Sequence, residues 1–190
     1  MNGGAVAYLT HSKYGRNGTE VTINNSSTYI TGNAGSTVSA SSASGVTNAY
    51  NTTAGQLASS TGNISGIYDL SGGVSEYTAA FNSAYSGLFF TGTSYLNAAG
   101  THFASTGGSS TKYATAYSNS TSTHYENFTV GTVSRTGDAI QEVWVSGYRA
   151  WFTDESSFVT SSDPFFVRGG SYSSGASSGV FYSNAYGVRR

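Results

Sequence analysis

The residue types that carry most covalent and metal chemistry are scarce in this chain of 190 residues. It contains no cysteine, which excludes disulfides, zinc–thiolate sites and thiol nucleophiles. Its 3 histidines, His11, His102 and His124, lack the spacing that places metal ligands on one helix face. We therefore expect no catalytic metal centre, and we expect the histidines to lie in exposed loops.

Acid–base and serine chemistry are supported no better by residue spacing. The close carboxylate pairs are Asp138 with Glu142 and Asp154 with Glu155, and only the first has the spacing of one helix face. Nothing else around Asp138 and Glu142 points to acid–base catalysis. No Gly-x-Ser-x-Gly segment lies between an expected strand and an expected helix, where hydrolases place their nucleophile. The sequence predicts that the protein is not an enzyme.

Composition restricts the class of partner. Charged residues make up 9% of the chain, against about a quarter in ordinary globular proteins, and the formal net charge is −1. Without a basic stripe, nucleic acid is not an expected partner, and no apolar run reaches membrane-spanning length. The polar surface must consist of Ser, Thr, Asn, Gly and Tyr, which hydrogen-bond adaptably as binding loops do.

The elements that would position such a surface are short. We expect strands at residues 5–9, 20–24, 165–167 and 180–182. Residues 75–85 have a weakly helical spacing of apolar and aromatic residues, or form a loop with aromatic anchors. We expect a single domain over residues 1–190, with loop-rich insertions at 31–63 and 91–134.

Two segments carry a resemblance to a known family. Residues 66–77 read GIYDLSGGVSEY, and residues 164–172 read PFFVRGGSY. Together they resemble the signature motifs of the formylglycine-generating-enzyme/sulfatase-modifying-factor domain, a variant of the C-type-lectin fold. Residues 187–189 are the candidate for the family's closing G-F-R motif, and Ser75 stands where the family has Trp. The span from Arg168 to Gly187 is shorter than the family's usual distance to its G-F-R motif, so we expect the C-terminal strand to be truncated.

Further segments resemble a branch of this family that occurs on surface and pilin-like proteins of gut bacteria. These segments are residues 4–15, 137–142, 151–170 and 175–184. The resemblance implies an α+β, C-type-lectin-like fold that is loop-rich, with short twisted strands and few helices. The family's enzyme prototype oxidises cysteine with a pair of cysteines and copper, and a chain without cysteine cannot do so.

We expect no required cofactor, but the resemblance also suggests a structural calcium ion. In the family, the acid of the first motif can bind calcium together with nearby carbonyls. The matching groups here are Glu76 and the carbonyls of Ser71, Gly72 and Val74, and carbonyl oxygens are acceptable calcium ligands. The alternative is that Glu76 pairs with a buried arginine such as Arg168, or caps backbone amides.

The C-terminal segment is the candidate binding face. In lectin-fold proteins diversified by retroelements, this region holds variable ligand-binding residues rich in Tyr, Ser and Asn. The matching residues are Tyr172, Ser173, Ser174, Ser177, Ser178, Tyr182, Asn184 and Tyr186. The plainer interpretation is that the whole chain is rich in these types. We expect Tyr172, Tyr182, Asn184 and Tyr186 to be accessible, Phe166 and Val180 to be buried, and Tyr68 to share a core with Phe166.

The expected function is non-catalytic binding of a protein or glycan ligand, in adhesion or display on a cell surface, pilus or phage particle. The alternative is a structural, degenerate domain of the same family that supports a larger surface protein. An enzyme is the third and least favoured class. Residues 1–4 lack the basic start and apolar stretch of a secretion signal, so an extracellular location implies a signal outside this sequence.

Overall fold

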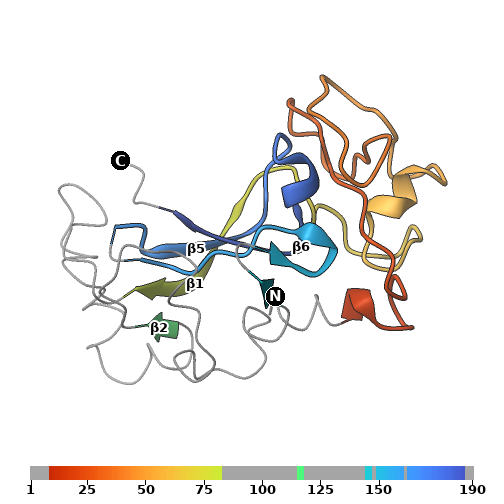
Figure 1. Cartoon of the computed structure of the whole chain (residues 1–190). Coiled ribbons are helices and arrows are strands. Elements are labelled where there is room, and N and C mark those ends of the chain that lie inside the picture. Colours follow the sequence, from red (N-terminus) through yellow and green to blue (C-terminus); the bar gives the residue numbers. More distant parts are fainter. Residues whose placement is uncertain (1–8, 83–114, 118–143, 147–148, 161, 187–190) are drawn as a thin grey trace. The chain divides into compact units, whose positions relative to one another are not determined.

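The computed structural model describes residues 9–82, 115–117, 144–146, 149–160 and 162–186 (Figure 1). The chain folds into two compact units, each formed from several separate stretches of sequence. The first unit comprises Met1–Glu76, Arg135–Ser156 and Arg168–Ser183. The second comprises Tyr77–Ser134, Ser157–Val167 and Asn184–Arg190.

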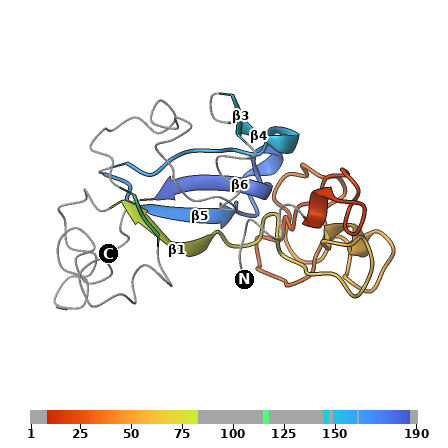
Figure 2. The ribbon, with the colours of Figure 1, turned by 90° about the horizontal axis from the view of Figure 1, so that it is seen from below.

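Strands are the main regular elements of the described residues. A 4-stranded sheet has the order β2-β1-β5-β6, from β1 (Glu76–Asn82), β2 (Thr115–Tyr117), β5 (Phe165–Gly169) and β6 (Gly179–Tyr186). β1 and β2 are parallel, with Ala80 opposite Thr115. Figure 2 shows β1, β5 and β6 side by side. A separate antiparallel pair joins β3 (Trp144–Ser146) to β4 (Arg149–Ala150).

Helical structure is short wherever the chain is described. The described residues include the 3-10 helices η1 (Gly55–Ala58), η3 (Trp151–Thr153) and η4 (Gly175–Ser177), and residues 9–11 are α-helical. No helix in the described part is both long and apolar enough to pass through a bilayer. The prediction of a mixed fold with short strands and few helices is confirmed at this level.

The strand predictions have different outcomes along the chain. Those at 165–167 and 180–182 are confirmed by β5 and β6. Residues 5–8 lie outside the described part, as does most of 91–134. Residues 20–24 are not a strand, and only Asn24 forms an isolated bridge, with Gly72. The reason is local, because the Asn24 side chain accepts a hydrogen bond from the Ser26 amide and turns the chain away from extended pairing.

The prediction of a helix or loop at residues 75–85 was wrong over residues 76–82, which form β1. Tyr77 and Thr78 are residue types that strands favour, and the Thr78 hydroxyl donates to the Phe166 carbonyl of β5 at 3.4 Å. Pairing within the sheet outweighs the weak helical spacing of this segment. The remainder of the segment lies outside the described residues.

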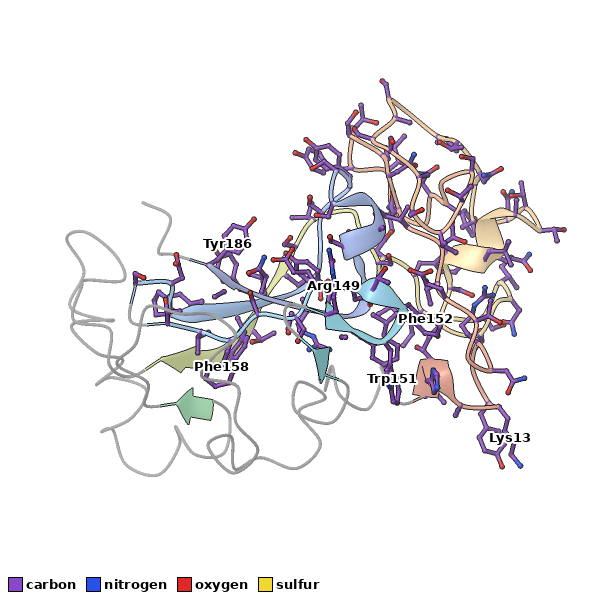
Figure 3. All side chains as sticks on the ribbon, viewed as in Figure 1. Lys13, Arg149, Trp151, Phe152, Phe158 and Tyr186 are labelled. Carbon is purple, nitrogen blue, oxygen red and sulfur yellow. The ribbon has the colours of Figure 1, made fainter. Side chains whose placement is uncertain are left out.

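Aromatic packing holds the second unit together. Phe158, Val159, Phe166 and Val167 are buried, with Phe166 only 1% exposed. The Phe158 and Phe166 rings meet edge to face, with centroids 5.3 Å apart (Figure 3 labels Phe158). Tyr77 and Phe165 form a second edge-to-face pair, at 6.0 Å. The predicted burial of Phe166 is therefore confirmed.

The first unit has an apolar cluster of its own. Val21, Ala150, Val180 and Phe181 are buried, and the partly buried side chains of Leu70, Trp151 and Phe152 pack against them. This confirms the prediction that Val180 is buried. Tyr68 also belongs to this unit, where it packs edge to face on Tyr50 at 6.3 Å. Since Phe166 belongs to the second unit, the prediction that Tyr68 and Phe166 share one core was wrong.

Candidate binding site

The two sequence motifs meet through their backbones in the first unit. The Gly72 amide donates to the Gly169 carbonyl at 2.8 Å, and the Tyr172 amide donates to the Gly73 carbonyl at 2.9 Å. Gly72 has a φ of 77°, and a Cβ atom there would collide with the Asn24 carbonyl oxygen. Only glycine fits a turn that combines this φ with so close an approach.

Asn24 fastens this junction to the preceding loops. Its amide donates to the Ser71 carbonyl, and its carbonyl accepts from the Gly73 amide, both at 2.7 Å. Its side-chain nitrogen donates to Asp69 Oδ1 at 2.7 Å and to the Ile30 carbonyl at 2.8 Å. Because Asn24 is buried and uses both backbone and side-chain groups, it joins Ile30 to the segment 69–73.

Asp69 is held by the same set of hydrogen bonds. Its carboxylate accepts from the Gly32 amide at 3.0 Å through Oδ1 and 3.2 Å through Oδ2, in addition to the Asn24 side chain. Asp69 also has a φ of 59°, a left-handed conformation that aspartate tolerates better than most residues. The carboxylate therefore has a fixed orientation with acceptor capacity to spare.

A pocket of about 210 Å³ opens beside this junction. It is lined by Asn24, Tyr29, Thr31, Asp69, Gly73, Val74, Ser75 and Glu76. Two of these residues carry carboxylates, three carry hydroxyls, and none is basic. All lie in the first unit, so the pocket is formed within one body.

An exposed tyrosine stands at this pocket in an unfavourable backbone conformation. Tyr29 is 60% exposed, and its φ is 59°. A bulky residue in the left-handed region is uncommon and costs on the order of 1 kcal/mol or more. The Tyr29 ring packs edge to face on Tyr172 with centroids 5.6 Å apart. Tyr172 comes from the second motif, so both motifs and the Tyr29 loop contribute to this site.

Only some of the predicted calcium ligands lie at this pocket. Glu76 and Val74 line the pocket, whereas Ser71 and Gly72 do not. The Ser71 carbonyl accepts the Asn24 amide, and Ser71 is buried. Within the described residues, no cluster of three or more His, Cys, Asp or Glu side chains could hold a metal ion. The arginine offered as an alternative partner for Glu76, Arg168, donates to the Val180 carbonyl at 3.2 Å.

The predicted C-terminal face does not stay together as one exposed surface. Ser173 is exposed, Tyr172, Ser174 and Ser177 are half-buried, and Ser178 is buried. Their hydroxyls largely serve the turn itself, since Ser174 Oγ contacts Ser171 Oγ at 3.0 Å and Ser178 Oγ donates to the Ser171 carbonyl. Tyr172 reaches the pocket residues through its ring contact with Tyr29 and its amide hydrogen bond to Gly73.

The prediction that Tyr182 is accessible was wrong, because it is only 3% exposed. That prediction required the chain to bend at its glycines, but Gly179–Tyr186 runs as a regular strand in the sheet. Residues 155–156 also run along this strand, where Ser156 bridges to Ser183. Asn184 and Tyr186, also expected to be accessible, are half-buried because they continue the same strand, and they belong to the second unit (Figure 3 labels Tyr186).

The carboxyl of Asp154, which precedes Glu155 in the sequence, is the second notable polar group of the first unit. Asp154 is 1% exposed, and its Oδ2 atom accepts the Phe181 amide at 2.9 Å. Burial raises the pKa of this carboxyl to about 8, despite the opposing hydrogen bond from Phe181. The preceding residues Phe152 and Thr153 have left-handed φ values of 63° and 72°. The acid is thus a protonated structural group at neutral pH.

The remaining candidates for chemistry are isolated or lie outside the described part. His11 is exposed, as expected, but it lies in the α-helical residues 9–11 and not in a loop, and its ring packs on Trp151 with ring centroids 4.2 Å apart (Figure 3 labels Trp151). His102, His124, Asp138 and Glu142 lie outside the described residues. Sequence reasoning missed Tyr29, Asp69 and Asn24. The one available signal was the Asp69 position within the first motif, since Tyr29 and Asn24 sit in Asn- and Ser-rich loops without distinctive spacing.

No family model, curated protein or solved structure significantly matches this chain. Its function is therefore inferred from the pocket and from the residues that hold the pocket in place.

Proposed function

We propose that the protein is a non-catalytic ligand-binding domain and that the pocket between Tyr29 and Glu76 is its binding site. The observation that carries this proposal is the placement of Tyr29. An exposed aromatic side chain is held in a left-handed backbone conformation, at the rim of a pocket, against a second tyrosine. Such backbone strain persists where the surrounding structure enforces it, and it concentrates at sites of function.

The construction of the pocket supports the same conclusion. The lining residues Asn24 and Asp69 are fixed by several hydrogen bonds, whereas Tyr29, Val74 and Glu76 are exposed. A rigid polar base with exposed aromatic groups matches how binding loops combine tyrosine contact area with adaptable hydrogen bonds. Fixed acceptors beside exposed aromatic and apolar groups support binding as the role of these side chains.

The resemblance to the sulfatase-modifying-factor family belongs to this proposal as well. The Gly72–Gly169 and Tyr172–Gly73 backbone hydrogen bonds join the two motifs and support the assignment to this family, as a C-type-lectin-like domain displayed at an extracellular surface, pilus or phage particle. The separation of Tyr68 from Phe166 counts against it. A protein or glycan is the class of ligand that this setting implies.

The structural alternative draws on a different observation. Burial of Tyr182 and Ser178 removes two members of the predicted binding face and assigns them to packing. A purely structural domain would use its tyrosines in this way throughout. Tyr29 separates the two functions, because its ring is exposed and contributes little to packing beyond its contact with Tyr172.

A ligand screen with matched variants tests the proposal. Fragments, amines and glycans would be titrated into isotopically labelled protein, and amide shifts followed by NMR. We expect shifts at residues 73–76 that disappear in Tyr29→Asn and Tyr172→Ala. Asparagine tolerates the left-handed conformation, so the first variant removes the ring without adding strain.

Tyr14→Ala is the control variant, since Tyr14 is 74% exposed and does not line the pocket. It should leave every ligand response unchanged. Ligands that bind all variants equally, or a screen in which no compound shifts residues 73–76, would leave the structural role as the better account.

A further inference from the structure

The charge of the pocket indicates the chemistry of its ligand. Asp69 and Glu76 both line it, and no Lys, Arg or His is among the lining residues. Like charges that share a site without a counter-charge are unfavourable, and a ligand that supplies the opposite charge relieves that cost. The pocket is therefore complementary to a cation.

The two carboxylates differ in how they are presented. Asp69 is fixed by the Asn24 side chain and the Gly32 amide, so its remaining lone pairs point from a rigid base. Glu76 is exposed and begins β1, so its side chain can adjust to the ligand. One fixed and one adjustable acceptor suit a group with several hydrogen-bond donors, and an ammonium has three of them.

The aromatic rim adds a third contribution. The Tyr29 ring stands at the pocket and packs on Tyr172 through an edge-to-face contact, which leaves a large part of the ring exposed. A cation over the face of a tyrosine ring is attracted by the ring's quadrupole. The alkyl chain that carries an ammonium group would contact the same ring and the exposed Val74 side chain.

We propose that this pocket binds an alkylammonium group, supplied either by a free amine or by a lysine side chain of a partner protein. This inference rests on the pocket being the binding site. The pocket volume of about 210 Å³ accommodates an alkyl chain and its ammonium group, and it far exceeds the space of a bare metal ion. A neutral polyhydroxyl ligand would leave both carboxylate charges without a counter-charge.

The test uses two probes that differ only in the charged group. Nα-acetyl-lysine methylamide and its norleucine analogue are titrated into the labelled protein, and affinity is read from amide shifts at residues 73–76. We expect binding of the lysine probe alone, weakened as salt rises from about 10 mM to about 0.5 M because exposed charges are screened. Equal binding of the norleucine probe would overturn the proposal.

Variants connect that binding to the named residues. Glu76→Gln should weaken the lysine probe roughly two- to fivefold, because an exposed carboxylate contributes a modest ion-pair energy. Tyr29→Asn should weaken it by a similar factor. Asp163→Asn removes the same charge from a residue that does not line the pocket, and it should have no effect. Because Glu76 is exposed, its substitution leaves the fold intact and keeps the result interpretable.

Further probes separate the sources and the competing ligand classes. Equal affinity for n-butylamine identifies a free amine as sufficient, whereas tighter binding of a lysine-containing peptide identifies a partner protein. If calcium chloride shifts residues 73–76 and displaces the lysine probe, the pocket is a metal site and the proposal is wrong. If methyl glucoside binds there and both amines do not, the pocket is a binding site but not for ammonium. If no probe shifts these residues, the proposed function fails as well.

Discussion

The two units of this protein differ in what is buried inside each of them: the first has a network of buried amides beside its apolar cluster, whereas the second has buried aromatic and aliphatic side chains. In the second unit, buried phenylalanine and valine side chains pack on one another, as Phe158 does on Phe166. In the first unit, the loops around residues 20–73 have buried amides at their centre, and Asn24, Asn25 and Asn33 are each at most 3% exposed. Asn33 donates to the side-chain oxygens of both other residues.

This contrast explains why the candidate site lies where it does. Apolar packing is roughly proportional to buried area and has little directional preference. Hydrogen bonds have strict geometry, so a polar network fixes the direction of each participating group. The Asn24–Asp69 pair thus positions a carboxylate at the pocket in a way that an aliphatic core could not.

The largest loss of stability is expected from a substitution in the apolar interior of the second unit. Phe166→Ala should lower the free energy of unfolding by about 3–5 kcal/mol, since it removes a fully buried ring and leaves a cavity beside Phe158. Urea denaturation would measure the loss, and Phe166→Leu, which keeps most of the volume, should lose clearly less. A cost below about 1 kcal/mol would show that this cluster is not a core.

The next effect tests the polar network. Asn24→Ala removes a side chain that donates to Asp69 and Ile30 and accepts from Ser26 and Asn33. Buried partners left without a hydrogen bond each cost about 1–3 kcal/mol, and relaxation recovers part of this, so we expect a total loss of about 3 kcal/mol.

Asn48→Ala provides the matched control for Asn24→Ala. Asn48 is half-buried, and its side chain donates to the Ala34 and Gly35 carbonyls at 3.2 and 3.1 Å. The loss should be about 1 kcal/mol, because water can replace these bonds. Equal losses for Asn24→Ala and Asn48→Ala would mean that Asn24 is not the centre of the network. Hydrogen exchange at residues 30–33 and 69–73 would locate the damage.

The sequence could predict the apolar strands but not the polar hydrogen-bond network. The apolar runs at residues 165–167 and 180–182 indicate strands directly, because hydrophobic pattern reports burial. Residues 31–63 appear as polar loop by composition, and the buried contacts of Asn33 there cannot be deduced, since pairing depends on distant residues. The same holds for Asp69, which lies 45 residues from its partner Asn24. The motifs located the junction of the site, but the loop that supplies Tyr29 has no pattern of its own.

A smaller effect is expected from Asp154, a buried polar group placed beside an apolar cluster. Its pKa is about 8 in the folded protein and 3.8 in an unperturbed aspartate. Between those values the folded state holds a proton that the unfolded state has released, so stability falls as pH rises. The slope is at most about 1.4 kcal/mol per pH unit, and we expect a loss of about 2 kcal/mol between pH 6 and pH 8.

Denaturation of Asp154→Asn over the same range isolates this residue from other titrating groups. The variant should lose the pH-dependent part that Asp154 contributes, and above pH 8 it should be more stable relative to wild type than at pH 5. Identical pH profiles for the two proteins would mean that the carboxyl ionises normally and is not desolvated as the geometry indicates.

The smallest expected effect concerns Gly73, where the backbone rather than a side chain determines the site. Gly73 has a φ of 69°, and a Cβ atom there would approach only the Asn24 side-chain nitrogen, at an ordinary 3.8 Å. Gly73→Ala should therefore cost about 1 kcal/mol, the conformational penalty of a left-handed alanine without a collision. Gly73→Asn should cost less, because asparagine tolerates this region.

Both backbone bonds of Gly73, to Asn24 and from Tyr172, should persist, so the pocket should still respond to a ligand that the wild type binds. Thermal denaturation would measure the stability of each variant, and the NMR titration would measure the response of its pocket to the ligand. A loss of several kcal/mol, or a pocket that no longer responds, would mean that the junction of the two motifs depends on more than the conformation of its glycines.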